Sequence, residues 1–200
     1  MSRAGFFQRG AIGGGALLVS ASGLTALGLP SAASAATTAP DGDLAYLRLL
    51  IATELLAVDF QTNALAGGKL RHAAHSVVRR IRSDENSHYT LLAGVLTAAG
   101  QTPATSDDID FSYPKGTFRS QASILGLAGR LEHLMVGAYL GAVENVETPE
   151  LRLPIGQIAA NEAQHQGAFA ALGGRPVVGN AFAPALSIGA VSDALDAFES

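Results

Sequence analysis

Two short stretches of the sequence place a glutamate three positions before a histidine. RSDENSH carries Glu85 and His88, and NEAQHQ carries Glu162 and His165. Residues three apart lie on one face of an α-helix, with about 5–6 Å between their Cβ atoms. A carboxylate and an imidazole so placed can bind one metal ion together, and the carboxylate can also reach a second ion. The spacing therefore indicates metal coordination.

A further glutamate precedes each of these stretches by about 30 residues, in an apolar segment. TELLAVDF contains Glu54 and LEHLMVGAY contains Glu132. Glu132 comes 78 positions after Glu54, and the two Glu-x-x-His pairs lie 77 positions apart. The sequence thus holds a weak two-fold repeat of a helix pair. A single Glu-x-x-His is more often a solvated pair on a helix surface, whereas two in register, each with its upstream glutamate, are a specific sign of a site.

The six residues predict a neutral site for two metal ions. Four carboxylates in a dry core would repel one another and raise each other's pKa values unless cations lay between them. Two divalent cations would balance the four glutamates, and two neutral imidazoles would complete the coordination. Oxygen and nitrogen ligands without thiolate suit iron or manganese, and zinc is chemically feasible. Tyr139, two turns after Glu132, could donate a hydrogen bond to a ligand, and a core tyrosine with a satisfied hydroxyl is an equal alternative.

Four long helices must position these residues. Apolar residues recur at the helical spacing of three and four positions in four segments: 43–65, 70–99, 118–146 and 149–172. Thr148 and Pro149 are typical of a helix start, and Ser187 is a candidate cap for a short C-terminal helix. The first and last pairs of segments have short links, whereas a long polar stretch joins the second segment to the third. The pattern predicts an all-α four-helix bundle with one long crossover.

The ligand pattern resembles the ferritin-like di-iron carboxylate superfamily, and in particular the exported bacterial ferritin-like domain proteins. The resemblance covers about residues 43–172, and the tail NAFAPALSIGAVSDALDAF is also similar to theirs. It implies a ferritin-like bundle in which two helices each give one glutamate and the other two each give Glu-x-x-His. All six positions are filled here. Two departures are the absence of a rubredoxin-like cysteine set and an N-terminus unlike that of a cytosolic storage cage.

The N-terminal segment predicts export. MSRAGFFQRG has two arginines and no acid, an apolar Gly-rich stretch follows, and SAASAA supplies a cleavage site after Ala35. SRAGFFQ resembles a twin-arginine signal with Ala4 in place of the second arginine. We therefore expect a signal peptide over 1–35, a linker over 36–42, the bundle over 43–172 and a tail over 173–200 that packs on the bundle. The alternative is an uncleaved membrane anchor, and membrane contact is expected only in that case.

Composition excludes several other classes of protein. With 15% charged and 48% hydrophobic residues, the 200-residue chain is not disordered. A net charge of −4 without a basic stripe argues against nucleic acid. The absence of cysteine excludes disulfides and thiolate ligands, and no Ser-His-Asp or phosphate-loop motif is present. The remaining histidines, His72, His75 and His133, are expected at the surface.

These features together predict an exported protein with a dinuclear iron or manganese centre. Such a centre could oxidise Fe(II) or reduce O2 or peroxide, and a manganese catalase is a variant of the same hypothesis. The alternative is a non-catalytic exported protein that uses the same bundle for binding or stress protection. An iron-storing cage is a third option that no feature favours. The oligomeric state stays open, with a homodimer among the options.

Overall fold

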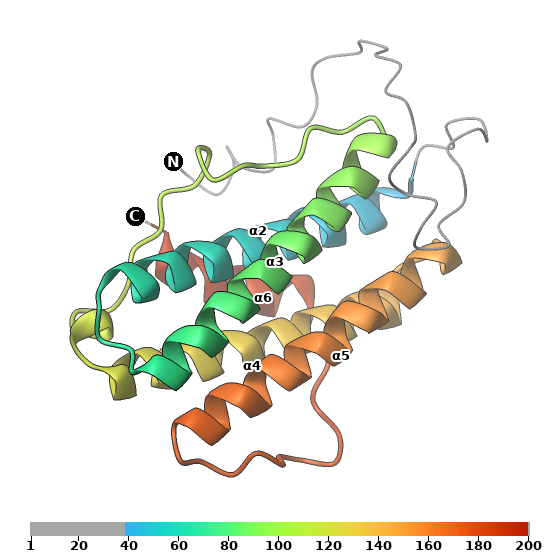
Figure 1. Ribbon diagram of the computed structural model, residues 1–200. Coiled ribbons are helices and arrows are strands. Elements are labelled where there is room, and N and C mark those ends of the chain that lie inside the picture. The colour runs from blue at the N-terminus through green and yellow to red at the C-terminus, as the bar shows by residue number, and fades with distance from the viewer. Residues whose placement is uncertain (1–38, 200) are drawn as a thin grey trace.

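The computed structural model describes residues 39–199 (Figure 1). Four long helices lie lengthwise beside one another: α2 (Asp41–Ala66), α3 (His72–Ala98), α4 (Gln121–Asn145) and α5 (Pro149–Leu172). A short helix, α6 (Ile188–Leu195), and two 3-10 turns, η3 (Thr117–Arg119) and η4 (Asp196–Phe198), complete the fold. The predicted all-α four-helix bundle with a long crossover and a short C-terminal helix is confirmed. The predicted signal peptide lies outside the described residues.

Helix ends follow local chemistry. The helix α5 starts with Pro149 after Thr148, as predicted, because proline has no N–H to lose at the first helical position. The helix α4 starts three residues later than predicted, since η3 precedes it and the hydroxyl of Ser120 accepts a hydrogen bond from the Ser123 N–H. Ser187 caps α6 in the same way.

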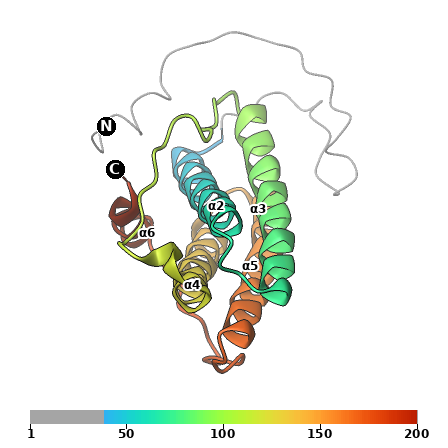
Figure 2. The same cartoon turned by 60° about the vertical axis from the view of Figure 1, so that its left-hand side comes forward.

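The helix α2 is the buried centre of the bundle. It packs against α3, α4 and α6, and Figure 2 shows it enclosed between them. Its apolar residues therefore point in nearly every direction, unlike the single stripe of a surface helix. Leu50, Ile51 and Phe60 are among its buried side chains. Within residues 39–199, no helix is long and apolar enough to cross a bilayer.

Residues 173–187 return from the end of α5 to the middle of α4, where α6 begins (Figure 1). The Leu186 N–H donates a hydrogen bond to the carbonyl of Gly137, at 2.9 Å. A Cβ atom at Gly141 would lie 1.9 Å from the Leu186 carbonyl oxygen. Glycine at this position therefore allows the backbone of the tail to approach the backbone of α4 directly.

Candidate metal centre

All six residues predicted as ligands meet in the middle of the bundle. Each long helix contributes from its inner face: Glu54 from α2, Glu85 and His88 from α3, Glu132 from α4, and Glu162 and His165 from α5. The four glutamates are at most 1% exposed, and the two histidines at most 9%. The helical spacing thus delivers a compact cluster of carboxylates and imidazoles inside an apolar core.

The cluster forms two groups that share their central residues. One group consists of Glu54, Glu85, His88 and Glu162, and the other of Glu85, Glu132, Glu162 and His165. Within each group, one ligand atom per residue lies within 4.8 Å of all the others. The Glu-x-x-His glutamates belong to both groups, so they can bridge two ions. Glu54 and Glu132 each belong to one group and can only be terminal ligands.

The histidine rings present Nδ1 to the cluster. The Nδ1 atom of His88 lies 2.8 Å from a Glu162 oxygen and 3.1 Å from a Glu85 oxygen. The Nδ1 atom of His165 lies 3.2 Å from Glu162 and 3.3 Å from Glu85. The two rings are stacked with centroids 6.0 Å apart. Nδ1 is therefore the atom with which each ring can bind an ion.

The outer ring nitrogens meet residues that sequence reasoning did not assign to the site. The Nε2 atom of His88 lies 3.0 Å from the side-chain oxygen of Asn161. The Nε2 atom of His165 lies 3.6 Å from a carboxylate oxygen of Asp84, which itself pairs with Arg80 at 3.0 Å. Asp84 and Asn161 each stand one position before a Glu-x-x-His glutamate. Each therefore faces the histidine of the opposite helix.

Two further buried side chains hold the carboxylates. The Tyr139 hydroxyl donates a hydrogen bond to Glu54, which is the contact that the sequence suggested for this residue. Gln61 donates to Glu85 at 3.2 Å. Gln61 stands seven positions after Glu54, as Tyr139 does after Glu132, so the internal repeat was the signal that could have identified it.

Burial governs the electrostatics of the terminal glutamates. It raises the pKa values of Glu54 and Glu132 well above the ordinary value. The repulsion of neighbouring carboxylates, Glu162 and Glu85, adds to this effect on both pKa values. Without a cation, both terminal carboxyls are therefore driven to retain a proton.

Hydrogen bonding outweighs burial in setting the pKa values of Glu162 and the two histidines. Burial raises the pKa of Glu162, but hydrogen bonds with His165 and His88 outweigh it and lower that pKa to about 2. Burial lowers the pKa of His88, but hydrogen bonds to Glu162 and Glu54 outweigh it and raise that pKa to about 12. The pKa of His165 is raised for the same reason. In the metal-free cluster, the positive charge of the protonated imidazoles therefore balances the negative charge of the carboxylates. A bound cation would take over this role from the protons.

The donor set fits divalent cations. Among the described residues, no lysine or arginine pairs with the four carboxylates, whose cationic neighbours are the two imidazoles. One oxygen of Glu54 and one of Glu132 are buried without a hydrogen-bond partner, and the nearest imidazole nitrogen lies 3.6 Å from each. Such orphaned acceptors are costly in a dry core. Two ions coordinated by these oxygens and by Nδ1 of each ring would remove that cost.

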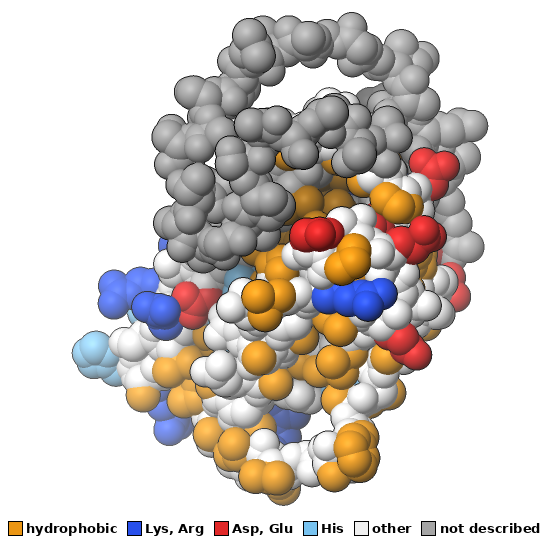
Figure 3. Space-filling view, turned by 90° about the vertical axis from the view of Figure 1, so that its right-hand side faces the viewer, with side chains coloured by type: hydrophobic (Ala, Val, Ile, Leu, Met, Phe, Trp, Pro, Cys, Tyr) orange, Lys and Arg blue, Asp and Glu red, His pale blue; other side chains and the backbone are white. Residues whose placement is uncertain are grey.

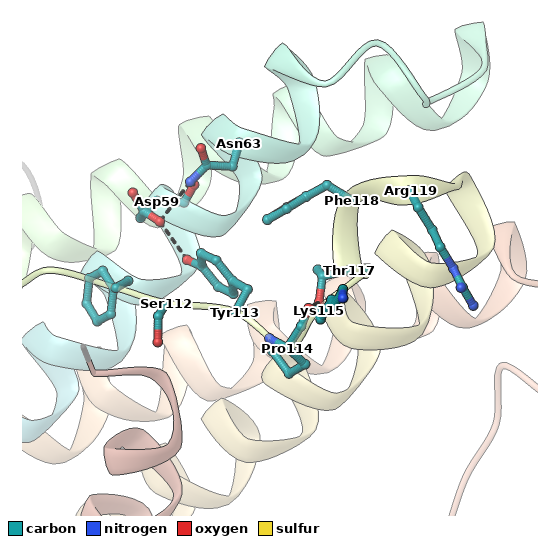
Figure 4. A pocket seen from close by; sticks show the side chains of 11 residues that line it. Asp59, Asn63, Ser112, Tyr113, Pro114, Lys115, Thr117, Phe118 and Arg119 are labelled. Carbon is teal, nitrogen blue, oxygen red and sulfur yellow. Dashed lines mark hydrogen bonds between the residues drawn. The ribbon is translucent and has the colours of Figure 1, made fainter.

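Other candidates lie away from the cluster. His72, His75 and His133 are exposed, and His133 contacts Gln166 at 3.0 Å. An open pocket of about 520 Å³ lies between α2 and the crossover (Figure 4). Asp59, Tyr113 and Lys115 are among its lining residues, and Tyr113 donates to Asp59 at 2.7 Å. None of the six ligand candidates lines this pocket.

Comparison with known families agrees with this geometry. The family described as a ferritin-like domain matches residues 42–175. This span includes nearly all of the four long helices and all six ligand candidates, and it exceeds half of the chain. The chain therefore belongs to the ferritin-like domain family. No curated protein sequence matches it significantly.

Proposed function

We propose that the cluster binds two iron or manganese ions and that the protein is a metal-dependent oxidoreductase acting on Fe(II), O2 or peroxide. The observation that carries the proposal is the pair of overlapping ligand groups, in which two buried glutamates are shared. A carboxylate-rich, thiolate-free set favours these metals among the common transition ions.

When bound, two adjacent ions would supply the electrons for redox chemistry. The chain's own residues have separate tasks. Glu85 and Glu162, which belong to both ligand groups, would help to hold both ions, and Glu54 and Glu132 would each help to hold one. Tyr139 orients Glu54 by a hydrogen bond, and Asn161 orients the ring of His88. The apolar side chains of the bundle exclude bulk water from the cluster.

The site of action that we propose is outside the cytoplasm, at the cell envelope or beyond it. This part of the proposal rests on the sequence of residues 1–35, with its arginines, apolar stretch and small-residue cleavage site. The competing function is non-catalytic, with the same ions stabilising a binding or stress-protection protein. The observation behind this non-catalytic function is the set of buried carboxylate oxygens without a hydrogen-bond partner, because metal ions with a purely structural role would also satisfy them.

Elemental analysis of purified protein tests the proposal. We expect about two iron or manganese ions per chain and none in the E85A/E162A variant, because both positions lose their shared ligands. Residual helicity measured by circular dichroism separates metal loss from unfolding. A well-folded wild-type protein that binds neither metal would refute the proposal. Metal binding without turnover of Fe(II), O2 or peroxide would favour the structural role.

A further inference from the structure

Exposed charges are unevenly distributed along α4, α5 and the residues that flank them. From Ser112 to Val143 and from Leu151 to Ser192, the only acidic residues are Glu132 and Glu162, and both are buried. The exposed charged side chains in these ranges are all cationic: Lys115, Arg119, Arg130, Arg152 and Arg175. The exposed acidic residues of α4, α5 and their link are Glu144, Glu147 and Glu150, where α4 ends and α5 begins. The surface built from residues 121–143 of α4, residues 155–172 of α5 and the tail segment (residues 173–187) therefore carries positive charge only, although the whole chain has a net charge of −4.

Large apolar side chains are exposed on the same face. In the tail segment Val177 is 58%, Val178 88% and Phe182 90% exposed. In Figure 3 hydrophobic side chains gather over the lower part of the molecule, where no acidic side chain is visible. Single exposed apolar side chains are normal on a monomer, but they mark an interaction surface when they occur together.

The backbone holds these side chains outward. Before Val178, the Arg175 guanidinium donates to the Leu125 carbonyl at 3.2 Å, and Val177 lies close to Gly167 of α5. After Phe182, Leu186 is hydrogen-bonded to Gly137 of α4. The segment is thus attached to the bundle at both ends, and Val178 and Phe182 project between the attachments.

The charge pattern decides between partners. In a two-fold contact between copies of the chain the face would meet itself, and Arg130 and Arg175 would approach their own copies. A partner must instead combine negative charge with an apolar layer that accepts projecting side chains. The surface of a bilayer containing anionic lipids has both properties.

We propose that the face formed by residues 121–143 of α4, residues 155–172 of α5 and residues 175–186 docks on an anionic lipid membrane. Val178 and Phe182 insert at the boundary between head groups and acyl chains, and Arg130 lies among the anionic head groups. This docking needs no metal, so it is independent of the function proposed above.

Co-sedimentation of the full chain with phospholipid vesicles tests this inference. We expect binding to vesicles of phosphatidylglycerol and phosphatidylcholine, weaker binding at high salt, and little binding to phosphatidylcholine alone. The V178D/F182D variant should bind at least tenfold more weakly, and R130Q roughly fivefold more weakly. The control T90D/T97D adds the same two charges at exposed positions of α3 and should bind as the wild type does.

Three results would overturn the inference. The first is a wild-type chain that does not sediment with the anionic vesicles. The second is equal binding by wild type and V178D/F182D, which would place the contact elsewhere in the chain. The third is a wild-type dimer in sedimentation equilibrium that V178D/F182D dissociates, since the face would then bind a second copy. Unchanged thermal unfolding would confirm that the variants fold. We expect this result for V178D/F182D because both side chains are exposed.

Discussion

The two halves of the bundle, α2–α3 and α4–α5, provide the same ligands from different surroundings. Each half gives one terminal glutamate and one Glu-x-x-His. Behind these ligands, however, Gln61 in the first half corresponds to Tyr139 in the second. Asp84 likewise corresponds to Asn161. The two halves thus contribute the same types of ligand, whereas the residues that support those ligands differ between the halves.

The difference extends to the outer surfaces. The helix α3 faces solvent with polar and charged residues, such as Arg79, Arg80 and Asn86. Its counterpart in the second half, α5, instead has the tail residue Val177 against Gly167, and the tail also covers α4 through Gly137 and Gly141. A repeat in the sequence therefore specifies a symmetric interior and leaves each exterior free to acquire its own contacts.

The strongest test of the symmetry removes one terminal glutamate at a time. We expect E54Q and E132Q each to bind about one ion per chain where the wild type binds about two, because a neutral amide is a poor substitute for a carboxylate ligand. Elemental analysis after removal of loosely bound metal gives the stoichiometry. If either variant retained both ions, the corresponding glutamate would not be a ligand and the two halves would not be equivalent.

A second test addresses the coverage of α4. G141A should lower the free energy of unfolding by about 3 kcal/mol, since its methyl group would overlap the Leu186 carbonyl. The matched change G94A, in α3, has no atom within 4 Å of the new methyl group and should raise stability by up to about 1 kcal/mol. Urea denaturation measures both. Equal effects would mean that the tail does not rest on α4 in solution.

A third test uses pH on the metal-free protein. The pKa values of Glu54, Glu132, His88 and His165 are raised in the folded state. The folded protein therefore holds these protons more tightly than the unfolded chain does, and their stabilisation is complete only below the unfolded values of 4.5 and 6.5. It is lost progressively as pH rises above those values. The lowered pKa of Glu162 acts in the opposite direction, but only below 4.5.

We thus expect the free energy of unfolding in chelator to fall between about pH 6 and about pH 9. Urea denaturation across this range measures the slope, and the E54Q/E132Q variant should show a smaller one because two of the groups no longer titrate. Metal affinity should rise over the same range, since the ions displace protons. A metal-free wild type that gained stability with pH would show that the cluster does not retain these protons.

The sequence predicted what depends on one helix at a time. The spacing of Glu85 and His88 within a helix, and the recurrence of the pattern at Glu162 and His165, follow from helical geometry alone. Gln61 and Asn161 were missed because their partners lie on other helices, and those contacts depend on how the helices rotate against one another. The close approach of Leu186 to Gly141 was missed for the same reason, since no local pattern specifies where a tail docks.

The contacts of Asn161 with His88 and of Asp84 with His165 offer the test with the smallest expected effect. An amide can turn either its oxygen or its nitrogen toward His88, whereas a carboxylate presents only oxygen. N161D should therefore hold the Nε2 hydrogen outward, leave Nδ1 free for the ion, and tighten the His88 position by up to about tenfold. D84N should weaken the His165 position by a similar factor.

Competition titration with Mn(II) resolves the two affinities, and the exchange variant D84N/N161D supplies the control because it keeps the net charge constant. If charge behind the ring sets the affinity, the exchange should reverse which position fills first. Crystals grown with one equivalent of Mn(II) would show this order in anomalous scattering. An unchanged order would mean that the ion pair with Arg80 neutralises Asp84, so that its charge does not affect His165. The terminal glutamates alone would then distinguish the two positions.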